Sequence, residues 1–322
     1  MRVLSDDDVA ALLDLPALLP EIERAFRKQG RGEVERPERP HFPVGTGLEG
    51  DEPLGTGLTM PAYVHGDEQY ATKLASVHGG NADRGLPTVQ AQIALTSART
   101  GEPAGLLAGT RITNARTGCI GGLAARELAV GDGPVRLGVV GAGTQARWQT
   151  RAIAASRGVE SARIYSPSES REACAADLRA EGIDAKAVES AREAVSDVDV
   201  VVTATTATEP VFPGDALAAG TLVVAVGAYT AEMRELDSAT VSRAAGLFAD
   251  VPEEAAKTGD FPEHDESAFT PLSAVFEGEA GRESDEDVLV VASVGSAVLD
   301  AAAATALFEQ AVAANVGTDV GL

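Results

Sequence analysis

Residues 141–146 read Gly-Ala-Gly-Thr-Gln-Ala and follow an apolar run that begins at residue 135. A strand, a tight glycine turn and a helix N-terminus in this order form the usual site for the pyrophosphate of a dinucleotide. The first glycine permits the turn, the second lets the backbone approach the phosphates, and the final alanine lets the helix pack close to the strand. The N–H groups and positive dipole end of the helix favour the anion. The segment therefore predicts cofactor contacts at Gly141, Ala142, Gly143, Thr144 and Gln145.

The elements expected around this loop favour a dinucleotide site over a purely structural turn. Residues 144–157 have the pattern of a helix, and residues 162–166, 199–205 and 221–227 have the pattern of later strands. Apolar strands that alternate with amphipathic helices are typical of a parallel sheet covered by helices. We therefore expect an α/β fold with a Rossmann-type, doubly wound dinucleotide-binding domain.

The end of the second strand bears on which dinucleotide binds. NAD-binding forms of this fold carry an acidic residue there, about 20 positions beyond the glycines, which accepts hydrogen bonds from the ribose 2′-OH. Here the position is Ser166, followed by Ser168 and Arg171. Hydroxyls and a guanidinium suit a 2′-phosphate, so the sequence slightly favours NADP(H) and leaves NAD(H) open. The alternative is that the serines cap a helix starting near Glu169.

The chain is strongly acidic. Its 322 residues include 49 Asp and Glu against 26 Lys and Arg, for a net charge of −23, and lysine stands at four positions only. A surface this negative repels polyanions, so neither nucleic acid nor membrane is an expected partner. Many acids and few lysines also suggest a halophilic protein of a salt-rich cytoplasm, where ions screen the self-repulsion. An ordinary acidic protein is the alternative.

The N-terminal residues and the rare metal-binding side chains exclude further classes. Residues 1–13 carry acids where a secretory signal has basic residues, and no apolar run reaches the roughly 18 residues of a membrane helix. We therefore expect a cytoplasmic protein. Two cysteines and four histidines show no spacing typical of metal ligands, so no metal site is expected.

Two domains are expected. The first 116 residues combine a helical opening at 6–31, a turn-rich passage at 37–53 and alternating runs at 70–77 and 88–95 that predict strands. Strands and helices then alternate until a final alanine-rich helix at 299–314. We assign residues 1–116 with 300–322 to a smaller α+β substrate and dimerisation domain, and residues 117–299 to the Rossmann domain. The acidic passage at 252–287 is expected to be loop-rich.

Several further segments carry a family resemblance. In order they are Met60-Pro61-Ala62-Tyr63, Thr72-Lys73-Leu74, Gly79-Gly80-Asn81, Gly85-Leu86-Pro87-Thr88, Thr113-Asn114-Ala115-Arg116-Thr117, the glycine loop, Glu209-Pro210, Arg234-Glu235-Leu236-Asp237 and Ser293-Val294-Gly295. With them, residues 36–300 resemble the ornithine cyclodeaminase and mu-crystallin family, which includes archaeal alanine dehydrogenases and ketimine reductases. The resemblance also implies a homodimer whose substrate domains meet across the two-fold axis.

The resemblance assigns the substrate-binding residues. Lys73 matches the family's active-site lysine, which contacts substrate and can move a proton when burial or neighbouring cations lower its pKa; a lysine pointing to solvent is the alternative. Arg116 matches the arginine that grips the substrate carboxylate, a task suited to a planar guanidinium. A surface ion pair in the expected turn at 114–117 is the alternative for Arg116. Arg39 matches a second carboxylate-binding arginine.

Further positions match the family's pocket. Met60 is expected to line the substrate site and Thr88 the nicotinamide site, with plain packing as an equal alternative for both. Additional cofactor contacts are expected near the ends of the later strands and in the Ser-Val-Gly segment, at Thr205, Val226, Val294 and Gly295.

One departure from the family pattern narrows the expected reaction. Ornithine cyclodeaminases have an aspartate after the strand that ends near residue 227, placed to handle the amino groups of the substrate, whereas this chain has Tyr229. A tyrosine does not carry that negative charge near neutral pH. The sequence therefore favours the simpler reactions of the family, oxidative deamination of a small amino acid or reduction of an imine, over ornithine cyclisation.

We expect an NAD(P)-dependent oxidoreductase for a small amino acid or its imine, with an alanine-dehydrogenase-like activity as the leading specific hypothesis. In this scheme Arg116 and Arg39 fix the carboxylate, and Lys73 serves as acid or base. Run in reverse, the same site reduces an imine. Two alternatives stay open: an ornithine cyclodeaminase that forms proline, and a nonenzymatic NADP(H)-binding protein like mu-crystallin.

Overall fold

The computed structural model describes residues 1–321, apart from the side chain of Ala82, and the chain divides into two compact units. Unit 1 contains Met1–Asp14, Lys28–Arg116 and the chain from Ala297 onward. Unit 2 contains Leu15–Arg27 and Thr117–Ser296. Each unit is built around its own sheet.

Unit 1 has a mixed eight-stranded sheet. Its strands are β1 (Arg2–Leu4), β2 (Val34–Glu35), β3 (His41–Val44), β4 (Gly55–Val64), β5 (Gln69–Val77), β6 (Val89–Ser97), β7 (Pro103–Ala108) and β16 (Thr318–Asp319). The order is β16-β1-β7-β6-β5-β4-β2, and β3 also pairs with β4. The β1–β7 pair is parallel, whereas the others, from β16–β1 to β2–β4, are antiparallel. Side chains alternate between the two faces, so one face of β4 to β7 is buried.

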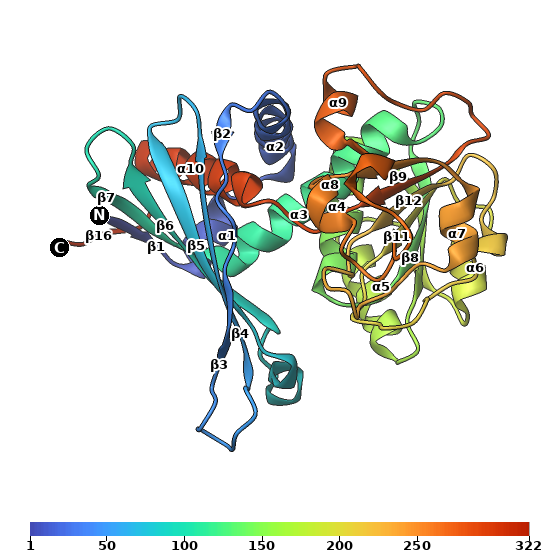
Figure 1. Ribbon diagram of the computed structural model, residues 1–322, viewed down its shortest axis with the longest axis horizontal. Coiled ribbons are helices and arrows are strands. Elements are labelled where there is room, and N and C mark those ends of the chain that lie inside the picture. Colours follow the sequence, from blue (N-terminus) through green and yellow to red (C-terminus); the bar gives the residue numbers. More distant parts are fainter. Residues whose placement is uncertain (322) are drawn as a thin grey trace. The chain divides into compact units, whose positions relative to one another are not determined.

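Helix α10 (Ala297–Ala314) covers the buried face of this sheet (Figure 1). A row of paired residues, Met60, Lys73, Ile93 and Leu107, runs across β4 to β7 on that face. Among the described residues α10 is the one helix long and apolar enough to cross a membrane, but 67% of it is buried inside the structure. It is the core helix of unit 1. The short elements α1 (Asp6–Leu12) and η1 (Gly79–Arg84) complete the unit.

Unit 2 has an eight-stranded, all-parallel sheet. Its order is β10 (Ala185–Ala187), β9 (Val159–Tyr165), β8 (Val135–Val140), β11 (Val200–Thr203), β12 (Leu222–Ala225), β15 (Val288–Ala292), β13 (Ala244–Ala249) and β14 (Phe269–Pro271). The central strands β11, β12 and β15 are buried along their whole length, as expected for a sheet with helices on both faces. Strand order reverses beside β8, which is the switch point of a doubly wound fold.

Several helices flank this sheet (Figure 1). They are α4 (Thr144–Ser156), α5 (Ser170–Ala180), α6 (Ala191–Val195), α7 (Ser238–Arg243), α8 (Pro252–Ala255) and α9 (Leu272–Phe276), with the 3₁₀ turns η2 (Gly214–Ala216) and η3 (Glu266–Ala268). Parallel strands joined through helices form the α/β architecture expected from the sequence.

The expected turn at residues 114–117 is wrong, because these residues lie inside helix α3 (Gly109–Leu128). Its glycines and β-branched residues are poor helix formers, so tertiary packing overrides propensity here. A Cβ on Gly118 would lie 2.6 Å from the carbonyl oxygen of Trp148, and one on Gly122 would lie 2.7 Å from that of Ala152. The glycines therefore let α3 pack in close contact with α4.

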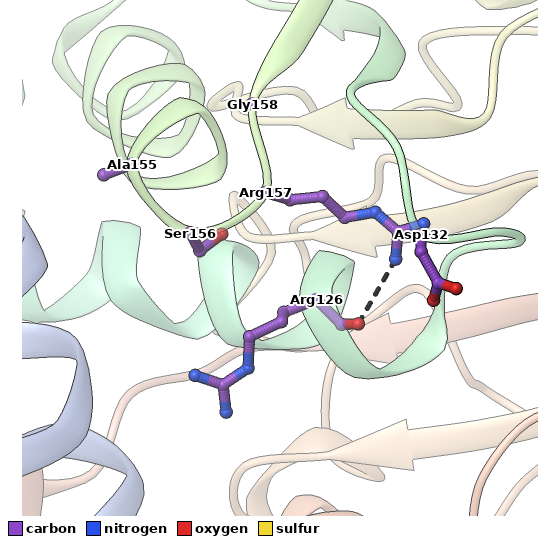
Figure 2. Close-up of a pocket in the computed structure, with 6 residues that line it drawn as sticks. All are labelled: Arg126, Asp132, Ala155, Ser156, Arg157 and Gly158. Atoms are coloured by element: carbon purple, nitrogen blue, oxygen red, sulfur yellow. Dashed lines mark hydrogen bonds between the residues drawn. The ribbon is translucent and has the colours of Figure 1, made fainter.

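Arg157 caps the C-terminal end of α3. Its guanidinium donates hydrogen bonds to the carbonyl oxygens of Ala125, Arg126, Ala129 and Val130 at 2.9–3.3 Å. Figure 2 shows this side chain reaching the end of the helix, beside a polar pocket of about 270 Å³. The pocket lies at the C-terminal end of α4 and the glycine loop at its N-terminal end. We therefore do not assign the pocket to the cofactor.

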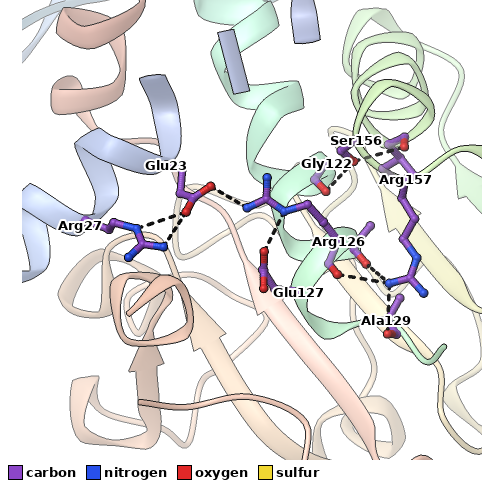
Figure 3. Close-up of polar contacts among 10 residues, drawn as sticks. Glu23, Arg27, Gly122, Arg126, Glu127, Ala129, Ser156 and Arg157 are labelled. Atoms are coloured by element: carbon purple, nitrogen blue, oxygen red, sulfur yellow. Dashed lines mark hydrogen bonds and ion pairs between the residues drawn. The ribbon is translucent and has the colours of Figure 1, made fainter. Parts of the chain in front are cut away.

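An ion-pair network joins α3 to α2 (Leu15–Gly30) within unit 2 (Figure 3). Glu23 accepts hydrogen bonds from Arg126 at 2.6 Å and from Arg27 at 2.7 Å. Nearby, the Ser156 hydroxyl donates to the carbonyl oxygen of Gly122 at 2.7 Å. These contacts connect α2 to α3 and α3 to α4.

Two expected boundaries differ from the structure. The helical opening at 6–31 is broken after Leu12 into α1 and α2. The acidic passage at 252–287 contains α8, η3, β14 and α9 between its loops. Elements of three to five residues are too short to show a hydrophobic period, so the sequence did not reveal them.

Candidate active site and cofactor loop

Lys73 is buried in the middle of β5, with 3% of its surface exposed. Its ammonium donates a hydrogen bond to Asp300 Oδ2 at 2.6 Å. Burial lowers the pKa of Lys73 to about 8; the Arg116 and Arg39 cations lower it too, while Asp300 opposes the shift. The alternative of a lysine pointing to solvent is therefore wrong. A buried amine with a pKa near neutrality is suited to proton transfer.

Asp300, in the first turn of α10, is the centre of this cluster and is 1% exposed. Besides Lys73, it binds Arg116 Nε through Oδ1 at 3.0 Å and accepts a hydrogen bond from the Thr113 hydroxyl at 3.2 Å. Burial acts to raise the pKa of Asp300, but the charges of Arg116 and Lys73 and their hydrogen bonds outweigh it and hold the pKa below its ordinary value. The carboxylate is ionised and orients both cations.

Arg116 lies on α3 and is 5% exposed, so a surface ion pair is excluded. Its Nε is used by Asp300, whereas its Nη1 is buried without a hydrogen-bond partner. An unpaired buried guanidinium nitrogen is costly unless a ligand satisfies it. A carboxylate is the group whose geometry fits a guanidinium best. The cluster therefore fits an anionic ligand bound next to Lys73.

Two further predicted substrate residues lie in the same unit. Met60 is buried on β4 and pairs with Lys73 across the strands. Arg39, between β2 and β3, is close enough for its charge to lower the pKa of Lys73. Thr88 precedes β6 and is partly buried, and its carbonyl oxygen accepts a hydrogen bond from the His78 N–H at 2.9 Å. The structure thus brings Lys73, Arg116, Met60 and Arg39 together, and the roles of all five residues stay predictions.

The glycine loop of unit 2 has the geometry that a pyrophosphate needs. Gly141 has φ +116°, and a Cβ there would lie 2.4 Å from the carbonyl oxygen of Ala204. A Cβ on Gly143 would instead project into open space. Gly143 is also the N-cap of α4, and no side chain caps the helix. Ala142 is buried, while Thr144 is exposed at the first turn and Gln145 is partly buried. The open N–H groups fit a dinucleotide phosphate.

The predicted strand-end residues form one polar group in unit 2. Ser166 directly follows β9, its hydroxyl lies 3.4 Å from that of Ser168, and Arg171 donates to the carbonyl oxygen of Ser166 at 3.2 Å. Helix α5 has Glu169 as its N-cap, with no side-chain hydrogen bond. The alternative that the serines cap this helix is therefore not what the structure contains.

A buried glutamate that sequence reasoning assigned no role holds the loops after β11 and β12. Glu235 accepts hydrogen bonds from the Thr203 hydroxyl, from both the N–H and the hydroxyl of Thr205, and from the N–H of Gly227, at 2.6–2.8 Å. Val226, beside them, donates its N–H to the Thr203 carbonyl oxygen. Burial raises the pKa of Glu235, and these hydrogen bonds oppose the shift.

Asp250 holds the loop after β15, as Glu235 holds the loops after β11 and β12. It accepts hydrogen bonds from the Ser293 hydroxyl and from the N–H groups of Val294 and Gly295 at 2.7–3.2 Å. Thr205, Val226, Val294 and Gly295 therefore all lie in loops at the carboxyl ends of parallel strands, where ligands bind in this architecture. Their contact with a cofactor stays a prediction.

Asp300, Thr113, Glu235 and Asp250 were missed as functional residues. Asp300 had a visible signal, since it is the only charged residue in the otherwise apolar run at 297–308. A charge inside an apolar helix is rarely buried without a partner. Glu235 belongs to the Arg234-Glu235-Leu236-Asp237 segment that carries part of the family resemblance. The sequence does not show which backbone N–H groups will donate hydrogen bonds to its carboxylate.

Tyr229 lies in the loop after β12 and is 45% exposed. Partial burial raises the pKa of its hydroxyl, so it is neutral at neutral pH. It therefore brings no negative charge to this loop.

A doubly wound sheet with an open glycine loop, together with a buried lysine–aspartate–arginine cluster, defines a dinucleotide-dependent enzyme. Comparison with known proteins gives its family: residues 1–315 match the model of the ornithine cyclodeaminase/mu-crystallin family, and the chain belongs to this family. It is an NAD(P)-dependent reductase or dehydrogenase that acts on imino or amino acids, which confirms the class of enzyme expected from the sequence.

Two curated relatives illustrate the similarity. A Δ1-pyrroline-2-carboxylate reductase of Bacillus cereus is 34% identical over 87% of this chain and 89% of that protein. An alanine dehydrogenase of Archaeoglobus fulgidus is 32% identical over 99% of this chain and 97% of that protein.

Solved structures agree with the fold. The Δ1-pyrroline-2-carboxylate reductase of Thermococcus litoralis, in complex with NADH and L-proline, has a TM-score of 0.93 and 35% identity, and the match covers 99% of this chain and 100% of that one. An archaeal alanine dehydrogenase dimer with bound NAD has a TM-score of 0.90 and 28% identity, over 100% of this chain and 99% of that one. The expected α/β fold, with a Rossmann-type domain and a second mixed-sheet domain, is confirmed.

Proposed function

We propose that this enzyme reduces a cyclic imine that carries a carboxylate next to the C=N carbon, as in Δ1-pyrroline-2-carboxylate, to the corresponding cyclic amino acid. The observation that carries the proposal is the buried cluster in which Lys73 and Arg116 share Asp300 and Arg116 keeps an unpaired Nη1. It offers one binding group for a carboxylate and one proton donor for the adjacent nitrogen. A cyclic ketimine needs nothing more from the protein, since no ammonia or water enters the reaction.

Each residue has a defined role in this scheme. Arg116 binds the carboxylate through Nη1, and Arg39 adds positive charge to the same site. Lys73 donates a proton to the imine nitrogen, and Asp300 orients its ammonium. Met60 borders the ring. The dinucleotide, when bound, supplies the hydride that the imine carbon receives. Lys73 then regains its proton from solvent.

The pKa of Lys73 sets the expected direction of pH dependence. Reduction needs the ammonium form, which predominates below the pKa of about 8. The reverse oxidation needs the neutral amine, which predominates above it. We therefore expect reduction to slow and oxidation to accelerate as pH rises through about 8.

Alanine-dehydrogenase-like activity, the leading specific hypothesis from the sequence, is the second candidate. Its support is the similarity to the Archaeoglobus fulgidus enzyme over 99% of this chain. In that reaction Lys73 also has to accept a proton from the water that attacks the iminium carbon and donate one to the ammonia that leaves. Ornithine cyclisation is disfavoured by the neutral Tyr229.

The experiment is a substrate panel with the purified enzyme. NAD(P)H consumption is measured with Δ1-pyrroline-2-carboxylate, Δ1-piperideine-2-carboxylate and pyruvate plus ammonia, and NAD(P)H formation with L-proline and L-alanine. The proposal predicts a kcat/KM for the cyclic imines at least tenfold above that for pyruvate plus ammonia. The opposite order supports the second candidate, and proline formed from ornithine without net cofactor consumption contradicts both.

The preference between NADP(H) and NAD(H) stays a prediction. The lack of an acidic residue at Ser166 supports NADP(H), since no carboxylate there repels a 2′-phosphate. NADH and NAD in the similar solved structures support NAD(H). Binding affinities for both reduced dinucleotides decide the point.

A homodimer formed through the sheet of unit 1 is part of the proposal. The face opposite Lys73 exposes Tyr70 and Leu74 of β5, and beside Tyr70 lies an apolar hollow of about 300 Å³. A second copy of the chain is the occupant that the archaeal alanine dehydrogenase dimer suggests. Light scattering should give twice the monomer mass for the wild type, and Leu74→Asp should shift the protein toward monomers.

A further inference from the structure

A group of three serines, Ser166, Ser168 and Ser170, lies where β9 meets α5, and we call it the serine cluster. The hydroxyls of Ser168 and Ser170 are 2.7 Å apart, and that of Ser166 lies 3.3 Å from Ser170 and 3.4 Å from Ser168. Hydroxyls both donate and accept, so this cluster can meet a ribose 2′-OH or a 2′-phosphate equally well. The choice between the two ligands must then depend on charge.

Arg171 is the cation fixed beside the serine cluster. Its Nη1 donates to the carbonyl oxygens of Ser166 and Ser168 at 3.2 and 3.4 Å, and only 13% of the side chain is exposed. Its Nε is buried without a hydrogen-bond partner. The guanidinium is therefore held in place by the backbone, with unused capacity to donate hydrogen bonds.

Glu189, two residues beyond the end of β10, forms an ion pair with the Arg171 guanidinium. Its Oε2 accepts a hydrogen bond from Arg171 Nη2 at 3.0 Å, and its side chain is 80% exposed. Glu169 is 4.0 Å from the same nitrogen. A 2′-phosphate would have to share Arg171 with these carboxylates, whereas a 2′-OH brings no charge into the competition.

We propose that Glu189 sets the cofactor preference of the enzyme, because it occupies Arg171 and so competes with the 2′-phosphate of NADP(H) for this cation while leaving NAD(H) unaffected. The inference rests on the proposed dinucleotide site and goes beyond it by naming the residue that discriminates. Glu189 acts here on affinity for the 2′ substituent and takes no part in the reaction.

The exposure of Glu189 makes the test clean. An exposed ion pair contributes little to stability, so Glu189→Gln should fold and melt like the wild type. Removal of one unit charge a few ångströms from the phosphate should still tighten NADPH binding about five- to tenfold. The affinity for NADH should change less than twofold.

Binding is measured directly at one fixed salt concentration, without substrate. The single tryptophan, Trp148 on α4, provides the fluorescence signal for NADH and NADPH titrations. Calorimetric titration with 2′,5′-ADP, compared with ADP, isolates the 2′-phosphate. Glu172→Gln is the matched control, since it removes the same charge from the first turn of α5. Arg171→Ala is made alone and together with Glu189→Gln.

The expected results are tighter binding of NADPH and 2′,5′-ADP to Glu189→Gln, no such gain for Glu172→Gln, and loss of the gain when Arg171 is also alanine. An unchanged NADPH-to-NADH affinity ratio in Glu189→Gln overturns the inference and leaves the proposed function standing. A gain that survives Arg171→Ala also overturns it. A protein that binds neither dinucleotide would contradict the proposed function itself, and the inference with it.

Discussion

Asp300 in unit 1 and Glu235 in unit 2 are both buried carboxylates, yet their surroundings are opposite. Asp300 faces the cations Lys73 and Arg116, whereas Glu235 accepts its four hydrogen bonds from two hydroxyls and two backbone N–H groups. The pKa of Asp300 is lowered by its cations despite burial, and the pKa of Glu235 is raised by burial. Asp300 therefore orients charged side chains, whereas Glu235 holds backbone segments in place.

The difference shows how the two units divide their work. Unit 1 concentrates charge around one side chain that can lose a proton. In unit 2, Glu235 and Asp250 instead hold the strand-end loops through hydroxyls and backbone N–H groups, which carry no charge. Substitutions at these sites should therefore have effects of different kinds.

Asp300→Asn should have the largest effect. It leaves two buried cations without an anion, which should lower the free energy of unfolding by about 3–5 kcal/mol. It should also lower kcat by about 10²–10⁴-fold and move the upper pH limit of reduction to lower pH, because Asp300 raises the pKa of Lys73. Denaturant titration and a pH–rate profile measure these effects. Asp319→Asn, at the exposed pair with Arg2, is the control. An unshifted pH profile in a folded variant would show that Asp300 is structural only.

Lys73→Met should reduce kcat by about 10²–10⁴-fold with a much smaller change in stability. The buried Asp300 keeps Arg116 as its partner in this variant. Steady-state kinetics and a thermal melt separate the two effects, and NADH affinity should stay within twofold of the wild type. Lys186→Met, at an exposed position of β10, removes a lysine without expected consequence. Turnover that survives Lys73→Met would remove the lysine from the proposed mechanism.

Glu235→Gln should weaken cofactor binding rather than chemistry. An amide nitrogen would face N–H groups that now meet a carboxylate oxygen, which should cost about 1–3 kcal/mol of stability and loosen the loops of Thr205 and Gly227. The dissociation constant of NADH should rise severalfold, and the pH profile of kcat should keep its shape. Glu232→Gln, an exposed neighbour, is the control. A shifted kcat profile would contradict the contrast with Asp300.

The pH dependence of stability should differ in sign between the two carboxylates. Glu235, with a raised pKa, favours folding most when protonated, so its contribution should fall as pH rises from its ordinary value of 4.5 through the folded pKa. Asp300, with a lowered pKa, should lose its contribution as pH falls below its ordinary value of 3.8. Unfolding free energies of the wild type and both variants between about pH 3 and 7 test this. If the free energies of unfolding of the wild type and both variants change with pH in parallel, the two carboxylates do not differ in the predicted way.

Salt should have the smallest effect on the two buried carboxylate sites. It should act instead on the stability of the whole chain. The net charge of −23 predicts that the melting temperature rises by several degrees between low salt and ~1 M salt, as screening reduces self-repulsion. The Lys73–Asp300 pair is buried and should respond little. Differential scanning calorimetry of wild type and Asp300→Asn should show equal salt shifts. A melting temperature that is flat in salt would leave an ordinary acidic protein as the better description.

Much of unit 2 could be predicted from sequence because its signals are local. The glycine loop and the apolar strands of this unit each have a recognisable composition, and the structure places them near the expected bounds. Lys73 and Arg116 could be named only through resemblance, since they are 43 positions apart in the sequence. Their convergence depends on strand pairing and on the packing of α3, which no local pattern encodes.

Asp300 shows the limit most clearly. It lies 227 residues from Lys73 and 184 from Arg116, and it reaches them because α10 covers the sheet that contains Lys73. The turn expected around Arg116 failed for a related reason. Thr113, Asn114 and the nearby glycines disfavour a helix locally, whereas tertiary contacts favour one: Gly118 and Gly122 pack against α4, and Thr113 bonds Asp300 of α10.

The glycines of α3 have a consequence for evolution and for engineering of the cofactor site. Gly118 and Gly122 let one helix rest on the backbone of the helix whose first turn would hold the phosphates. A single methyl group at either position would act as a wedge between the two helices and displace that anion-binding turn, although neither glycine would ever touch a nucleotide. Attempts to retune the enzyme for other cofactors should therefore leave this remote interface unchanged.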